Sequence, residues 1–210
     1  MHSARLLASS DAVGSVVVAA PADDVDHVRT VLDRLGLDAE ITVVAGGSTR
    51  SESVLRALRT LPDDVDVVLV HDAARPLTPV GLVDAVDAAV RAGHVAVVPG
   101  LAVVDTVKRV ELPADGSLPL VSGTVDRTDL RAVQTPQGFR RDVLDAAYDA
   151  ARLQGNLDAT DDAGLVERLG HGVAVVPGEE TAFKVTRPLD LILADAVLTQ
   201  RAAAHEGGAS

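Results

Sequence analysis

The chain has 210 residues, of which 47% are hydrophobic and 1% aromatic, and its formal net charge is -12. This length and apolar content predict a single folded domain and exclude general disorder. The acidic balance disfavours DNA or RNA as a partner, because phosphate backbones need a basic face. With no cysteine in the sequence, disulfides and thiolate metal sites are excluded, which fits the reducing cytoplasm.

The amino terminus contains a short apolar run, which is typical of a signal peptide or of a buried strand. Residues 1–20 resemble a signal peptide, since Arg5 precedes apolar residues and a small-residue site follows. Asp11 interrupts this run, however, and residues 15–20 are better explained as a buried strand. No stretch reaches the ~18 apolar residues of a membrane-spanning helix. We therefore expect a cytoplasmic chain with no membrane partner.

Short β-branched runs alternate with amphipathic patterns over the first hundred residues, as in parallel α/β folds. The predicted strands cover residues 15–20, 41–44, 65–70 and 94–99. The predicted helices between and after them cover residues 23–36, 51–61 and 80–92. Strand 65–70 is almost wholly apolar, which indicates burial on both faces of a sheet.

The alternation breaks between Asp105 and Asp126, where two short β-type segments flank a turn-rich stretch at 113–117. This pattern lacks a helical face and predicts a β-hairpin arm at about 105–126. The α/β pattern then resumes with helices at 141–154, 161–169 and 188–203 and a strand at 172–176. We expect one domain over 1–210, with a flexible tail at 205–210. The predicted fold is a Rossmann-like, mostly parallel sheet with helices on both faces and the arm protruding.

Ligands of open parallel sheets bind beyond the carboxyl ends of the strands, so functional residues are expected in these segments. The segment 46–53 follows the second strand and combines two glycines with hydroxyl side chains before a helix. Glycines allow close backbone approach, and a helix start with hydroxyls supplies hydrogen-bond donors. An ordinary glycine turn with a serine cap explains the same residues equally well.

The segment after the third strand, 71–76, places Asp72 and Arg75 beside small residues. Asp72 is suited to coordinate Mg²⁺ or to accept hydrogen bonds from hydroxyl groups, whereas a surface ion pair is the alternative. His71 is interpreted as a strand-end histidine rather than a catalyst. Arg75, Arg127 and Lys184 all fall near strand ends of an acidic chain, which predicts an anionic ligand. Residues 160–162 are interpreted as a helix N-cap with acidic residues in its first turn.

Seven segments in this order resemble one family, the 2-C-methyl-D-erythritol 4-phosphate cytidylyltransferases of the non-mevalonate isoprenoid pathway. They are Gly46-Gly47, residues 71–76, Asp105-Thr106, Asp126-Arg127, residues 134–137, Thr160-Asp161 and residues 184–188. The resemblance spans about residues 15–199 and implies a nucleotide-diphospho-sugar-transferase-like fold. It implies transfer of the cytidylyl group from CTP to methylerythritol phosphate, with Mg²⁺ as cofactor. It also implies a homodimer whose arms reach into the partner's site.

The resemblance further implies a role for each matching residue. Arg127, from the partner's arm, and Lys184 would be catalytic and would position the substrate phosphate. Asp72 would lie between the nucleotide and the polyol hydroxyls, near the metal. The supporting substrate-binding residues would be Arg75, Thr106 and Thr135. The cytosine and ribose would contact Gly47, Ser48, Ser53, Asp72 and Ala73.

One feature of the family has no counterpart in this sequence. The family opens with a strand inside the sheet and a glycine-rich loop whose arginine and lysine grip the triphosphate. Without that strand, two strand edges should remain unpaired. Because each lost preorganised contact costs roughly 10²–10³ in rate, we expect the 210-residue chain to fold poorly or to show negligible transferase activity. We also expect the natural protein to extend upstream of Met1.

Two alternatives to the main function stay open at this point. A related cytidylyltransferase acting on another polyol phosphate, such as ribitol 5-phosphate, would carry the same motifs. A non-catalytic dimeric binding protein would keep the substrate pocket and lack the triphosphate loop. Comparing pyrophosphate release with methylerythritol phosphate and with ribitol 5-phosphate distinguishes the first alternative from the main function. Binding of methylerythritol phosphate without turnover identifies the second.

Overall fold

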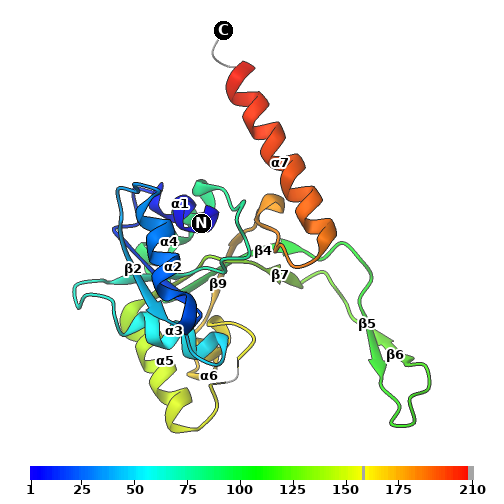
Figure 1. Ribbon diagram of the computed structural model, residues 1–210. Helices are drawn as coiled ribbons and strands as arrows, with labels where there is room; N and C mark the ends of the chain where they lie inside the picture. Colours follow the sequence, from blue (N-terminus) through cyan, green and yellow to red (C-terminus); the bar gives the residue numbers. More distant parts are fainter. Residues whose placement is uncertain (158, 208–210) are drawn as a thin grey trace.

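The computed structural model describes residues 1–157 and 159–207 of the chain (Figure 1). Its helices are α1 (His2–Ala8), α2 (Val25–Asp33), α3 (Arg50–Leu58), α4 (Val80–Arg91), α5 (Arg141–Leu153), α6 (Ala163–Arg168) and α7 (Pro188–Gly207). Its strands are β1 (Ser15–Ala20), β2 (Glu40–Ala45), β3 (Val67–Val70), β4 (Ala96–Ala102), β5 (Lys108–Glu111), β6 (Leu120–Thr124), β7 (Arg131–Val133), β8 (Gln137–Arg140) and β9 (Ala174–Pro177). Two short 3₁₀ turns, η1 (Ala22–Asp24) and η2 (Glu180–Ala182), complete the set.

The predicted elements occur in the predicted order, with boundaries that shift by a few residues, whereas α1, β7 and β8 were not predicted. The helix expected at 23–36 begins as the 3₁₀ turn η1 and becomes α2 at Val25. The expected tail at 205–210 overlaps α7, which continues to Gly207, and residues 208–210 lie outside the described residues. None of the helices over 1–157 and 159–207 has the length and apolarity needed to cross a membrane.

The larger sheet is built around β4. This strand pairs antiparallel with β8 at its start and with β7 at its end, and parallel with β9. Strand β8 also pairs antiparallel with β3, so β3, β4 and β9 run in one direction and β7 and β8 in the other. The two reversed strands follow the arm directly, without the crossover helix that a parallel connection needs.

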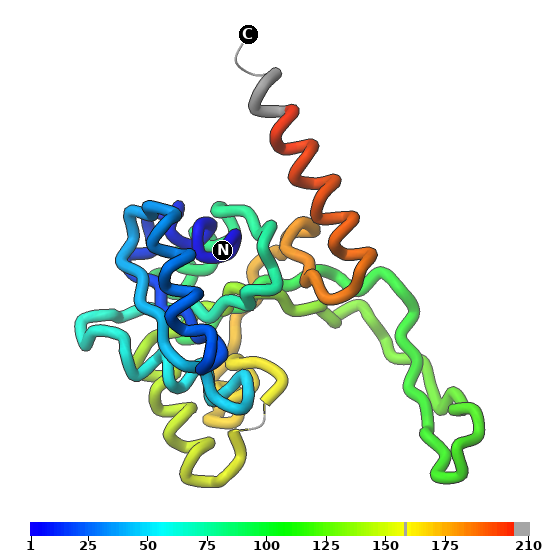
Figure 2. Tube along the Cα trace, viewed as in Figure 1, coloured from blue at the N-terminus to red at the C-terminus, as the bar shows by residue number. Residues whose placement is uncertain are grey.

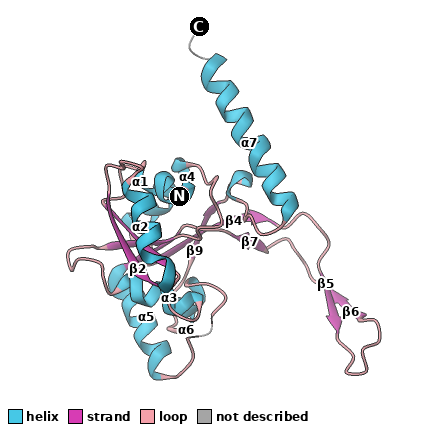
Figure 3. Cartoon of the chain, viewed as in Figure 1, coloured by secondary structure: helices cyan, strands magenta, loops and turns pink. Residues whose placement is uncertain are grey.

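Helices cover both faces of this sheet, as predicted (Figure 3). On one face Val97 packs with Val86 and Val90 of α4. On the other face Ala96 and Val98 pack with residues of α3, α5 and α6. The alternation along β4 thus divides the apolar side chains between two layers. This arrangement confirms the α/β fold class.

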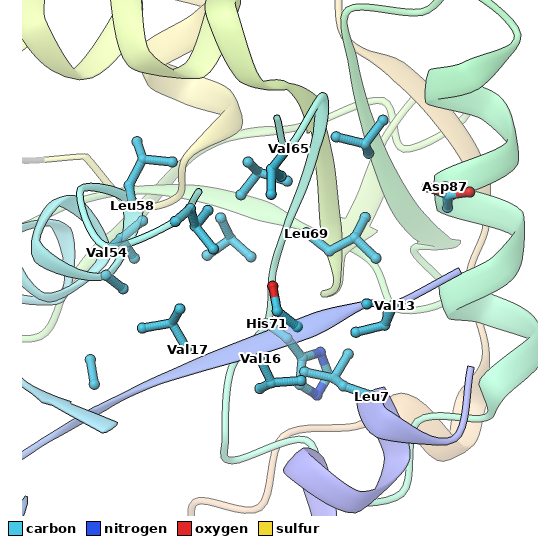
Figure 4. A pocket seen from close by; sticks show the side chains of 18 of the residues that line it. Leu7, Val13, Val16, Val17, Val54, Leu58, Val65, Leu69, His71 and Asp87 are labelled. Carbon is cyan, nitrogen blue, oxygen red and sulfur yellow. The ribbon is translucent and has the colours of Figure 1, made fainter. Parts of the chain in front are cut away.

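Strands β1 and β2 form a separate parallel sheet, in register from Ser15–Glu40 to Ala20–Ala45. Among the described residues β1 pairs only with β2, and β3 pairs only with β8. A cavity of about 530 Å³ lies against both strands. Figure 4 shows apolar side chains on its wall, including Val16 and Val17 of β1 and Leu69 of β3, and charged side chains also line it.

The predicted arm is present as the antiparallel pair β5 and β6, and it projects away from the body (Figures 1 and 2). Its apolar side chains are exposed: Val110 is 46% exposed, Leu120 72% and Val121 60%. Helix α7 extends from the body in another direction (Figure 2). The arm therefore carries an apolar surface that the rest of the described chain does not cover.

Candidate active site

Asp72 stands two residues after β3 and lies close to positive side chains from its own loop and from two other parts of the chain. Lys184 Nζ lies 3.1 Å from Asp72 Oδ2, and Arg50 Nε lies 3.2 Å from Asp72 Oδ1. Arg75 Nε lies 3.9 Å from Oδ2, and the Asp72 backbone N–H donates to Thr135 Oγ1 at 3.0 Å. We call Arg50, Asp72, Arg75, Thr135 and Lys184 the Asp72 cluster.

Local structure holds each cation of the Asp72 cluster in place. Arg50 is the first residue of α3, whose N-cap Thr49 accepts a hydrogen bond from the Glu52 backbone N–H. The segment that carries Lys184 is attached to the loop after β3, because the Val185 N–H donates to Ala74 O at 2.7 Å. Arg75 Nη1 donates to Ala182 O at 2.7 Å. The convergence therefore rests on backbone contacts as well as on charge.

The cations determine the charge state of Asp72. Burial by itself would raise the pKa of Asp72, but the hydrogen bond from Lys184 and the charges of Arg50 and Lys184 outweigh it and hold the pKa below its ordinary value. Burial lowers the pKa of Arg75, and Asp72 offsets part of that effect. The Asp72 cluster thus contains an ionised carboxylate with three cations beside it at neutral pH.

His71 has a supporting position next to the Asp72 cluster. Its Nδ1 lies 3.2 Å from Thr135 Oγ1 and its Nε2 lies 3.2 Å from Arg75 O. Burial lowers the pKa of the imidazole below its usual value, despite the opposing effect of the Arg75 carbonyl. A neutral ring with both nitrogens close to polar partners fits the prediction of a strand-end histidine.

The glycine segment after β2 forms a closed turn at the start of α3. The Gly47 N–H donates to Ser53 Oγ at 3.0 Å, and the Ser48 N–H and hydroxyl both donate to Glu52 Oε2 at 2.8 Å. A Cβ at Gly47 would lie 2.2 Å from Glu52 Cβ, so this position requires glycine. Ser53 and Ala73 line the cavity together with Arg50 and Asp72.

Two predicted site residues lie apart from this group. Thr106 is exposed at the base of the arm. Arg127 is also exposed there, where its Nη1 donates to Val104 O. Within the described part of one chain, the residues brought together are Asp72, Arg75, Thr135 and Lys184. Gly47, Ser48 and Ala73 lie on the adjoining turns, and Ser53 lies in the first part of α3.

Three residues of the site escaped the sequence analysis. Arg50 bridges Asp72 and Asp162, since its Nη2 lies 2.7 Å from Asp162 Oδ2. The hydroxyl of Tyr148 donates to Asp162 Oδ1 at 2.5 Å. Arg50 was hidden as an ordinary helix-start residue, and Asp162 as part of an N-cap. For Asp162, the sequence signal was the acidic pair Asp161-Asp162 at the start of a short apolar helix.

The chemistry of the donor set limits how a metal ion would bind. No group of three or more histidine and carboxylate side chains suited to a metal occurs among the described residues. Asp72 offers one carboxylate, and Mg²⁺ commonly takes one or two protein carboxylates and completes its shell with phosphates and water. The residues therefore fit an ion that arrives with a triphosphate and do not form a cage of their own.

Comparisons with known proteins agree with this geometry. Residues 1–200 match the family model of 2-C-methyl-D-erythritol 4-phosphate cytidylyltransferase, IspD. An enzyme of that name from Streptomyces avermitilis is 53% identical over 204 residues, covering 96% of this chain and 80% of the relative. One from Frankia casuarinae is 55% identical over 194 residues, covering 92% and 68%.

Solved structures of enzymes with these names have a fold similar to that of this chain. The cytidylyltransferase from Thermus thermophilus is 38% identical with a TM-score of 0.73, over 94% of this chain and 87% of that one. The 4-diphosphocytidyl-2C-methyl-D-erythritol synthase from Anaerococcus prevotii is 28% identical with a TM-score of 0.80, over 93% and 86%. The chain belongs to the 2-C-methyl-D-erythritol 4-phosphate cytidylyltransferase family.

Proposed function

We propose that this chain transfers the cytidylyl group of CTP to 2-C-methyl-D-erythritol 4-phosphate at the Asp72 cluster. The products are 4-diphosphocytidyl-2-C-methyl-D-erythritol and pyrophosphate. The observation that carries the proposal is the convergence of Arg50, Arg75 and Lys184 on one carboxylate at the end of β3. Such a site suits two anionic ligands in a protein whose overall charge is strongly negative.

The reaction needs positive charge more than it needs a proton acceptor. An oxygen of the substrate phosphate attacks the α-phosphorus of CTP, and the bond to the β-phosphate oxygen breaks as pyrophosphate leaves. Because the attacking oxygen is already ionised, no general base is required. Holding two anions in line against their repulsion supplies most of the acceleration. Lys184, whose side chain is 46% exposed, is accessible to the incoming phosphate.

We assign Mg²⁺ to the nucleotide, with Asp72 as its protein ligand. Bound to the triphosphate, the ion would neutralise charge on the phosphate oxygens. Asp72 is already ionised in the free protein, as a carboxylate ligand of the ion would have to be. Lys184 is half exposed and would contact the substrate phosphate. The turns that carry Gly47, Ser48, Ser53 and Ala73 would receive the cytosine and ribose, since they adjoin Asp72 along the cavity.

The site is proposed to be completed by a second copy of the chain. Arg127 and Thr106 stand at the base of an arm whose apolar side chains are exposed, and a two-fold dimer would bury that surface. In such a dimer Arg127 of one copy would reach the substrate phosphate of the other. We place the reaction in the cytoplasm, which suits a chain without cysteines.

Pyrophosphate release tests the proposal directly. The chain is incubated with CTP and Mg²⁺, and either methylerythritol phosphate or ribitol 5-phosphate is added. Release that depends on methylerythritol phosphate supports the proposed function. Release that prefers ribitol 5-phosphate would establish the other polyol phosphate as substrate. Binding of methylerythritol phosphate without release, even after the triphosphate loop is added, would indicate a binding protein.

A further inference from the structure

We infer that Asp162 is a positioning residue for the transfer, which acts through Arg50 to hold the Asp72 carboxylate in place. The inference rests on the proposed function, because it assumes that Asp72 serves the reaction. Asp162 itself is fully buried and does not line the cavity. Its effect on the reaction would pass through the guanidinium group of Arg50.

The burial of Asp162 needs an explanation that packing does not supply. The residue is 0% exposed, and an unpaired carboxylate at such a position would be very costly. Tyr148 donates to Oδ1 at 2.5 Å and Arg50 Nη2 donates to Oδ2 at 2.7 Å, so both carboxylate oxygens are occupied. A buried ion pair is weak evidence for stability, because apolar residues of similar size often serve as well. A role in orienting Arg50 accounts for the pair better.

Arg50 is the link between the buried carboxylate and the reaction site. Its Nη2 binds Asp162 while its Nε binds Asp72 at 3.2 Å. The guanidinium group is a rigid planar fork, so fixing one edge fixes the direction of the other. Burial by itself would lower the pKa of Arg50, but Asp162 and, to a smaller extent, Asp72 outweigh it and raise that pKa. Asp162 is thus the stronger of the two electrostatic partners, which makes it the anchor of the bridge.

The anchor is itself rigidly mounted on the sheet. Gln137 of β8 donates from Nε2 to Asp161 Oδ2 at 2.8 Å and accepts the Ala163 N–H at 3.2 Å. Asp162 therefore lies between two residues that are tied to one buried glutamine. Functional groups keep their geometry best when the residues behind them are fixed in this way.

Removing the charge of Asp162 should therefore displace Arg50. The cluster and its anchor contain three cations (Arg50, Arg75, Lys184) and two carboxylates, so a neutral residue 162 leaves one carboxylate against three cations. The side chain of Arg50 is 33% exposed and has a route to solvent. Asp72 would then lose the hydrogen bond from Arg50 to its Oδ1 and keep the ion pair of its Oδ2 with Lys184.

The first experiment measures pyrophosphate release by the whole chain with Asp162→Asn, Asp162→Glu and Arg50→Lys. Asn is isosteric but neutral, and Lys keeps charge without the fork. We expect Asp162→Asn and Arg50→Lys each to lower kcat by about 10–100-fold, the range seen when supporting partners are removed. The KM for methylerythritol phosphate should change less. Glu keeps the charge and should recover part of the loss. A purely structural role predicts the reverse, since the isosteric Asn would be tolerated better than Glu.

Asp87→Asn is the matched control. Asp87 is 7% exposed, and its Oδ1 and Oδ2 accept a bifurcated hydrogen bond from Arg91 Nε of the same helix at 3.0 and 2.8 Å. The Asp87→Asn variant should have a lower free energy of unfolding and an unchanged kcat. Tyr148→Phe removes one hydrogen bond from Asp162 and leaves its ion pair with Arg50, so its kcat should fall less than that of Asp162→Asn.

The second readout needs no turnover. Carbon-13 NMR of the Asp72 carboxyl in the free protein follows its titration, with Arg50, Lys184, Arg75 and His71 as the charged or titratable groups that face it. Asp162→Asn should raise the titration midpoint of Asp72, because Arg50 is displaced. An unchanged midpoint together with wild-type kcat would overturn the inference. If the wild type releases no pyrophosphate even after the triphosphate loop is added, the proposed function fails, and the NMR midpoint then tests only whether Asp162 holds Arg50 against Asp72.

Discussion

Asp72 accepts a hydrogen bond from a different cation on each carboxylate oxygen, and its backbone N–H is bound to Thr135. The two cations have different accessibility. Arg50 is held from behind by Asp162, whereas the half-exposed Lys184 contacts Asp72 through its terminal ammonium group. At the residue scale, Lys184 is therefore the group best able to leave Asp72 for an incoming phosphate.

Replacing Lys184 by Gln should separate its effect on catalysis from its effect on folding. We expect kcat/KM for methylerythritol phosphate to fall by roughly 10²–10³, as when one preorganised electrostatic contact is removed. Stability should change little, because the ammonium group is half exposed. Steady-state pyrophosphate release and urea unfolding give the two numbers. Arg152→Gln, which removes an exposed cation on α5, should change neither, and equal losses in both variants would count against the assignment.

His71 predicts how stability responds to pH. Its pKa in the folded protein is lowered by burial, while the unfolded chain has the ordinary value of about 6.5. The unfolded state therefore binds the proton first as pH falls, so the free energy of unfolding should decrease below about pH 6.5. Asp72 adds a separate loss only near and below about pH 4, because its pKa is also lowered.

Urea unfolding at a series of values between about pH 7.5 and about pH 5 checks this expectation, since the slope of stability against pH counts the protons taken up on unfolding. His71→Gln should flatten the dependence, and the exposed His171→Gln should leave it as in the wild type. A dependence that survives His71→Gln unchanged would show that another group is responsible.

The residue scale also shows what sequence reasoning can reach. Asp72, Arg75 and Lys184 were identifiable because each follows a strand and carries charge in an apolar setting. Arg50 and Asp162 were not, since they are 112 residues apart and meet only in the folded chain. Pattern analysis finds residues at strand ends, and it has no means of pairing two charges across such a separation.

At the scale of elements, the order of helices and strands was predictable from periodicity, and the reversal of β7 and β8 was not. Both strands are short, and β7 is exposed along its length, so neither has the alternation that reveals direction.

At the scale of the whole molecule, the arm presents exposed apolar side chains, among them Val110, Leu120 and Val121, at a distance from the body (Figure 1). If a second copy buries this surface, charges on it should prevent assembly. We predict that Leu120→Asp with Val121→Asp yields a monomer by light scattering and loses most of its activity. Val175→Asp, at an exposed apolar residue outside the arm, should remain dimeric. A fully active monomer would contradict the shared site.

The most direct test of a site built around Lys184 and completed by a second copy is subunit mixing. Arg127→Gln and Lys184→Gln are purified, confirmed to be nearly inactive, unfolded together and refolded at equal concentration. If Arg127 acts in the partner's site, each mixed dimer has one intact site, and random assembly restores about a quarter of the wild-type rate of pyrophosphate release. If Arg127 acts within its own chain, every site keeps one defect, and mixing yields no more activity than the separate variants.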